Sequence, residues 1–274
     1  MSAPAPLRLR PLEIGDLLDE VFRMYRRHFW LFAGISAILA IPSAAAQGFN
    51  YFSVFGQLLQ PTTTTNPEAA LGANVAVLIA SLINLALLPF AYGAVTYAAC
   101  ESAIGMQPAP GRIAMAVLTR YFPLLGFWLL IFVMLIAFCL LPLWVWIWVG
   151  WIAVMPAMFV ENIGLGRAMG RSWYLVQGRW WRTFLILFLL FILYTVVGWT
   201  LTGFTVSAIA LLALALPSYV AFVAVGAVNI LVNALVNPIL QIAVVLIYFD
   251  LRVRKEALDL FQMAHQLSAP AVPS

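Results

Sequence analysis

The chain has 274 residues, of which 65% are hydrophobic and only 9% are charged. An ordinary soluble domain has about 45–50% apolar and about 25% charged residues. Because so few charges cannot cover the surface of a globular protein, the composition excludes a soluble enzyme, a secreted disulfide scaffold, a disordered regulator and a nucleic-acid-binding protein. The sequence predicts an integral membrane protein.

The first predicted element is an amphipathic helix at about 12–27. Its apolar residues share one helical face, and they are Ile14, Leu17, Leu18, Val21, Phe22 and Tyr25. Acidic residues begin the segment and arginines end it, which complements the helix dipole. We expect this helix to lie on the cytoplasmic membrane surface with its apolar face towards the lipid.

Apolar stretches without charges follow, and a stretch of about 20 residues is enough to cross a bilayer as a helix. The sequence has room for six such spans, at about 29–46, 71–99, 121–141, 143–160, 183–212 and 219–249. A second amphipathic interfacial helix is predicted at about 164–181. The expected fold is an all-α integral membrane protein whose six transmembrane helices form three hairpins. It is one domain over 1–266, with a disordered tail at 267–274.

The basic residues predict the orientation of these spans. All 14 Lys and Arg residues lie before the first span, between the second and third, between the fourth and fifth, or after the sixth. Basic residues are enriched in cytoplasmic connections. The sequence therefore predicts a multi-pass protein of the bacterial inner (plasma) membrane with both termini in the cytoplasm.

A pattern recurs along the chain. Basic and aromatic residues precede the first, third and fifth spans, and an acid closes the second, fourth and sixth: Glu101, Glu161 and Asp250. One interpretation is three copies of a unit made of a surface helix and a two-span hairpin. The alternative is that any hairpin with both ends in the cytoplasm acquires such ends.

Four amide side chains recur every fourth residue in the predicted sixth span. They are Asn229, Asn233, Asn237 and Gln241. Because Pro238 lies among them and frees a backbone carbonyl, they are a candidate polar seam lining a substrate path. The alternative is a set of hydrogen bonds between helices.

Arginines at the predicted cytoplasmic face are candidate contacts for the headgroups of anionic phospholipids. They are Arg26, Arg27, Arg167, Arg171, Arg179 and Arg182. The closing acids, Glu101, Glu161 and Asp250, form either a headgroup-binding or gating ring or a set of ion pairs with neighbouring arginines.

No pattern in the sequence indicates catalysis. The two histidines, His28 and His265, lack a nucleophile with a third group, and Cys100 and Cys139 have no metal-binding spacing. The predicted spans contain no formal charge, so no proton relay is expected. We therefore expect no catalytic residues, no metal, no cofactor and no enzymatic activity.

Three segments resemble a known family. They are PLEIGDLLDE at 11–20 continuing to YRRHF at 25–29, the region from ENIG at 161–164 to LVQGRWWR at 175–182, and YFDLRVRKE at 248–256. Together they resemble the bacterial glycerophosphoryl diester phosphodiesterase membrane domain family. In members with phosphodiesterase activity, a separate soluble barrel with acids, histidines and a metal carries the reaction. The resemblance implies the membrane module without that domain, with a tie to envelope or phospholipid metabolism.

The expected function is therefore a non-enzymatic membrane module that binds anionic lipids or a membrane protein partner. A transporter or channel for a small polar or amphiphilic solute, using the seam at 229–241, is the alternative. A more distant alternative is a membrane enzyme whose chemistry uses Glu101, Glu161 or Asp250.

Overall fold

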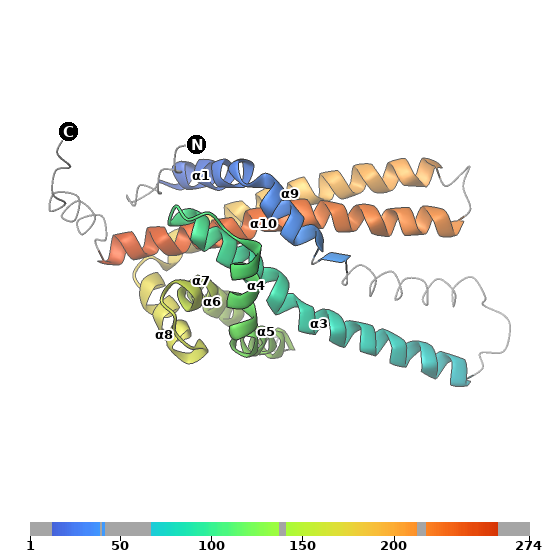
Figure 1. Cartoon of the computed structure of the whole chain (residues 1–274), viewed down its shortest axis with the longest axis horizontal. Helices are drawn as coiled ribbons and strands as arrows, with labels where there is room; N and C mark the ends of the chain where they lie inside the picture. The colour runs from blue at the N-terminus through green and yellow to red at the C-terminus, as the bar shows by residue number, and fades with distance from the viewer. Residues whose placement is uncertain (1–12, 39, 42–66, 137–140, 213–217, 257–274) are drawn as a thin grey trace.

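A computed structural model describes residues 13–38, 40–41, 67–136, 141–212 and 218–256. Within these ranges every regular element is a helix, which confirms the predicted all-α class for this part of the chain (Figure 1). The helices are α1 (Ile14–Arg27), a short helix Phe29–Ile38, α3 (Pro67–Ala103), α4 (Pro110–Thr119), α5 (Tyr121–Ile136), α6 (Leu141–Gly150), α7 (Val154–Val160), α8 (Leu165–Val176), α9 (Trp180–Leu212) and α10 (Ser218–Glu256).

Several helices are long and apolar enough to cross a membrane. In the described residues these segments are Ser81–Ala103, Leu143–Val160, Trp180–Phe204 and Leu231–Glu256. A fifth exists if α4 and α5, which meet at an angle of 65°, count as one bent span. Of the predicted first span, the structure describes Phe29–Ile38 and residues 40–41. The rest of that span, the predicted loop around 47–66 and the predicted tail at 267–274 lie outside the described residues.

The predicted amphipathic helix is present as α1. Its apolar face is buried through Leu17, Val21, Met24 and Tyr25, and this helix packs against α10. The apolar stripe that the sequence places against lipid therefore lies against protein.

The second predicted interfacial helix, at 164–181, is divided in the structure. Helix α8 ends at Val176, and α9 already begins at Trp180. The break lies around Gly178, whose φ of +88° is a left-handed conformation that favours glycine. Helix α4 is a third short helix, which starts with Pro110 at its first position and packs against α3.

The predicted span at 143–160 is interrupted by a turn at residues 151–153, between α6 and α7. The hydroxyl of Ser172 in α8 donates to the carbonyl of Gly150 at 2.7 Å and accepts from the N–H of Ala153 at 3.1 Å. These bonds satisfy backbone groups that the interruption leaves without helical partners. Non-helical backbone at membrane depth is tolerated where protein buries it, and both flanking residues are buried here.

The core lies where α3, α7 and α10 pack against one another, with α5 against α3 and α9 against α10. Figure 1 shows the short helices α1, α4 and α8 in the same half of the molecule as the C-terminal end of α10. We call this half the charged end. Away from it, large apolar side chains of α3, α9 and α10 are exposed, among them Leu78, Leu82, Phe191, Trp199, Phe204 and Leu231.

Candidate functional site

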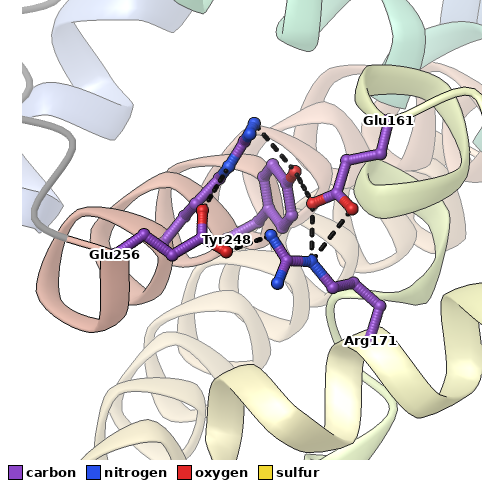
Figure 2. A network of polar contacts seen from close by, with 5 residues as sticks. Glu161, Arg171, Tyr248 and Glu256 are labelled. Atoms are coloured by element: carbon purple, nitrogen blue, oxygen red, sulfur yellow. Dashed lines mark hydrogen bonds and ion pairs between the residues drawn. The ribbon is translucent and has the colours of Figure 1, made fainter. Parts of the chain in front are cut away.

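The most connected polar cluster of the charged end joins α7, α8 and α10 (Figure 2). Arg171 binds both carboxylate oxygens of Glu161 through Nε, at 2.8 and 2.9 Å, and also binds Glu256. Tyr248 donates its hydroxyl to Glu161 at 2.8 Å, and Arg252 binds Glu256 at 2.9 Å. Two carboxylates and two guanidinium groups thus neutralise one another, and one phenol adds a hydrogen bond. The cluster holds three helices together, and none of its members is a nucleophile beside a free base.

A second cluster surrounds Asp250, which is buried in α10. Arg182, in the first turn of α9, binds its carboxylate at 2.6 Å, and Arg254 binds it at 2.9 Å. A buried carboxylate without a cationic partner costs several kcal/mol. The two arginines therefore make the burial of Asp250 tolerable and tie α9 to the end of α10.

The third closing acid, Glu101, is buried at the end of α3. Its partner is Arg112 of α4, whose Nε lies 3.4 Å from Oε1, while Oε2 has no hydrogen-bond partner in the described part of the chain. Arg112 also donates to the carbonyl of Gln107. All three closing acids are thus bound by arginines.

The six candidate headgroup arginines divide into three groups. Arg171 and Arg182 are engaged in the ion pairs above, whereas Arg26, Arg27 and Arg167 are exposed. Arg179 is half-buried at the break before α9. The three exposed arginines belong to α1 and α8, and in the described part of the chain they form no ion pair.

Two of the four amides in the predicted seam, Asn237 and Gln241, are hydrogen-bonded to neighbouring helices. Asn237 accepts a hydrogen bond from the Tyr194 hydroxyl of α9 at 2.8 Å. Gln241 accepts one from the Thr96 hydroxyl of α3 at 3.3 Å. The side chain of Asn233 is exposed, and that of Asn229 lies outside the described residues. Two members of the seam therefore bind two different neighbouring helices.

Sequence reasoning missed a set of hydrogen bonds that aromatic side chains donate to carbonyls of other helices. Tyr121 donates to Ala86 at 2.8 Å, and Trp180 donates to Trp146 at 3.2 Å. Tyr25 donates to Leu235 at 2.7 Å. Each accepting carbonyl belongs to the fifteenth residue before a closing acid, which is Glu101, Glu161 or Asp250 respectively. The spacing was readable in the sequence, but nothing in the sequence marked these aromatic residues as donors.

The same register extends to the short helices. We call Phe29, Tyr121 and Trp180 the start residues, because each begins the helix that follows a break. Eight positions before the start residues the side chains are all buried, and they are Val21, Ile113 and Ser172. Three positions after them the side chains are again all buried, and they are Phe32, Leu124 and Thr183. When the three segments are aligned on their start residues, they bury the same positions in the core, and the alignment needs no insertion or deletion.

The side chain directly after each start residue, in contrast, is exposed. These side chains are Trp30, Phe122 and Trp181, which are 85%, 80% and 77% exposed. A large aromatic side chain thus projects from the protein at the same place in all three segments.

Among the described residues, no three His, Cys, Asp or Glu side chains lie close enough together to bind a metal ion. Comparison with family models, with curated proteins and with solved structures found no match to this chain.

Proposed function

We propose that the chain is a non-enzymatic, multi-pass module of the bacterial plasma membrane that binds anionic phospholipids at its charged end. It has six spans in three hairpins, and both termini lie in the cytoplasm. A membrane protein partner is the second candidate for what it binds. The resemblance to the glycerophosphoryl diester phosphodiesterase membrane domain family supports a role in envelope or phospholipid metabolism.

The hairpin arrangement is supported by the common register. Unit 1 comprises α1, the helix Phe29–Ile38 and α3, unit 2 comprises α4 to α7, and unit 3 comprises α8 to α10. Each unit has a short helix, a break, an apolar helix and a second apolar segment that ends in a closing acid. In all three units the carbonyl fifteen residues before the closing acid accepts an aromatic hydrogen bond. The donor is the start residue in units 2 and 3, and it is Tyr25, four residues before the start residue, in unit 1.

The observation that carries the lipid proposal is the exposed aromatic position after each start residue. Trp30 and Trp181 carry an apolar ring with a polar N–H, which suits them to the boundary between lipid and water. The exposed Arg26 and Arg27 lie in the turn before Trp30, within reach of lipid phosphates at that boundary. Aromatic anchoring and exposed guanidinium groups together favour a surface for anionic headgroups.

Lipid retention after purification tests this proposal. The triple variant Arg26→Gln, Arg27→Gln, Arg167→Gln should lower the anionic lipid retained per protein by at least about tenfold, since each basic residue near such a surface contributes about 1 kcal/mol. The matched control is Arg23→Gln, also in α1, because Glu20 already pairs with Arg23 at 3.0 Å. Equal retention by the triple variant and the control would contradict the lipid proposal.

The orientation is tested by thiol labelling. Cys100 is buried, so we would replace it and Cys139 by alanine and place new cysteines at the exposed position Met106 and at Ser218, which lies between the predicted fifth and sixth spans. Met106→Cys should react with an impermeant reagent only from the cytoplasmic side, and Ser218→Cys only from the opposite side. The reverse pattern would overturn the proposed topology.

A transporter of a small polar or amphiphilic solute is the alternative function. The observation that favours it is the exposed Asn233 on a helix that contains Pro238. The hydrogen bonds of Asn237 and Gln241 favour a structural role for the rest of the seam. In proteoliposomes, solute flux that is unchanged in a folded Asn229→Leu, Asn233→Leu, Asn237→Leu variant would exclude the seam as a path.

A further inference from the structure

Helix α4 exposes apolar side chains at positions where the equivalent short helices expose polar ones. These positions lie six and three residues before the start residue. Their side chains are exposed in all three helices, and they are Arg23 and Arg26 in α1, Tyr174 and Gln177 in α8, and Met115 and Leu118 in α4. Helices α1 and α8 thus present charges, a hydroxyl and an amide. Helix α4 presents a thioether and an alkyl side chain, which are 64% and 60% exposed.

The opposite face of α4 is apolar as well. Ile113 and Val117 lie on that face and are buried in the core. The one charged residue in the sequence of α4 is Arg112, which pairs with Glu101 of α3. A helix that is apolar on all sides is typical of burial in protein or in a membrane. The outer face of α4 therefore needs an apolar partner.

The apolar surface of α4 continues into α5. From Met115 to Val133 every exposed side chain is apolar except that of Thr119, and Phe122 is 80% exposed. The hydroxyl of Thr119 lies 3.0 Å from each of two backbone carbonyl oxygens, those of Met115 and Ala116, to which it donates. Because this hydroxyl is satisfied within its own helix, it does not require water. The outer surface of this segment has the character of a lipid-facing surface.

The angle between α4 and α5 brings α4 close to the plane of the membrane. The two helices meet at 65°. Membrane-spanning helices are tilted on average by about 20° from the bilayer normal, so with α5 crossing the bilayer, α4 lies nearer to the membrane plane than to the normal. The ten residues of α4 extend only about 15 Å, which is too short to cross the bilayer alone.

We propose that α4 lies in the cytoplasmic leaflet and binds lipid acyl chains through Met115 and Leu118. Its inner face packs against α3, and hydrocarbon covers its outer face. The polar outer faces of α1 and α8 stay in the headgroup region or in water. Acyl chains bind α4 whatever headgroup they carry. The inference rests on the proposed units, spans and orientation, and not on headgroup binding by Arg26, Arg27 and Arg167.

Spin labels on single cysteines test this placement in nanodiscs of phosphatidylcholine. Cys100 and Cys139 are first replaced by alanine. A nitroxide at Leu118→Cys should then be relaxed more strongly by dissolved oxygen, which concentrates in hydrocarbon, than by a water-soluble nickel chelate. Gln177→Cys is the matched control, because it is the equivalent exposed position of α8. Its label should be relaxed more strongly by the nickel chelate.

A second pair and a reference label separate the possible failures. Met115→Cys and Arg23→Cys repeat the comparison between α4 and α1. Val133→Cys, on the exposed surface of α5, reports on the span itself and should favour oxygen. If the labels at 115 and 118 favour nickel while the label at 133 favours oxygen, the placement of α4 is wrong and the span stands. If all three favour nickel, the proposed span is wrong as well.

A protein partner on α4 gives a different result. Poor relaxation of the Leu118→Cys label by both reagents would mean that protein covers this face, and it would overturn acyl-chain binding. Phosphatidylcholine carries no net charge, so these labels do not depend on anionic lipid. A negative lipid-retention experiment with the arginine variants therefore leaves this proposal intact, and the two proposals fail separately.

Discussion

The hydroxyl of Tyr248 lies 2.8 Å from Oε1 of Glu161, the same carboxylate oxygen that Arg171 binds. One acid at the end of α7 therefore receives a phenol from α10 and a guanidinium from α8. This convergence makes Glu161 the point where three helices of the charged end meet (Figure 2).

Removing the phenolic oxygen of Tyr248 should weaken the contact between these three helices. Tyr248→Phe should lower the free energy of unfolding in detergent by about 2 kcal/mol, the usual contribution of a hydrogen bond to a charged group. Tyr174→Phe is the control, since the exposed Tyr174 ring contacts Lys255 through its face, which the change preserves. Equal losses in the two variants would show that the bond to Glu161 does not stabilise the fold.

The turn between α6 and α7 should be sensitive to a single methyl group. A Cβ at Gly150 would lie 2.4 Å from ring carbons of Trp173, so Gly150→Ala must displace a large, rigid side chain. We expect a loss of about 1–3 kcal/mol in the free energy of unfolding. Gly170→Ala, inside α8 with open space around the site, should instead be neutral or stabilising by up to about 1 kcal/mol. The same destabilisation in both variants would contradict the close packing of Trp173.

The hydrogen bond between Tyr194 and Asn237 is measurable by a double-mutant cycle. Unfolding of Tyr194→Phe, Asn237→Leu and the combined variant should give a coupling energy of about 0.6 kcal/mol, the average for such bonds in membrane proteins. A coupling energy of zero would mean that the bond does not join α9 to α10. Asn237 would then be free to serve the solute path.

The environment of His28 should depress its pKa. Burial disfavours the imidazolium, and the positive charge of Arg27 adds to this effect, so the pKa of His28 lies below its ordinary value of 6.5. Because the folded state holds the proton less tightly than the unfolded state, His28 contributes stability above pH 6.5 that is lost as the pH falls through its folded pKa. NMR titration should show the low pKa, and Arg27→Gln should raise it part of the way. A titration midpoint above 6.5 would contradict this account.

The local periodicity of the sequence was enough to predict α1, because a stripe at helical spacing depends only on neighbouring residues. It could not show that Leu17 and Val21 face α10, since lipid and a neighbouring helix demand the same apolar face. The pairing of the closing acids with arginines was one of the predicted alternatives. The identity of each partner depends on how the short helices pack, which local sequence does not determine.

The turn at 151–153 was also not predictable from the local sequence. Its flanks are uniformly apolar and rich in tryptophan, so neither charge nor hydropathy marks an interruption. The group that satisfies its backbone is Ser172, far along the chain in α8. Likewise, the sequence placed Tyr25 on the apolar face of its helix, and only the fold shows that Tyr25, Tyr121 and Trp180 each donate to a carbonyl of another helix.

The length of α10 has a consequence for the surrounding bilayer. At a rise of about 1.5 Å per residue, its 39 residues extend about 58 Å, and a typical hydrocarbon core is only about 30 Å thick. Helix α9, with 33 residues, also exceeds that thickness. Such mismatch is relieved by tilting the helices or by thickening the bilayer around them. In a bilayer of ordinary thickness, α9 and α10 would therefore either tilt or carry their ends beyond the hydrocarbon core.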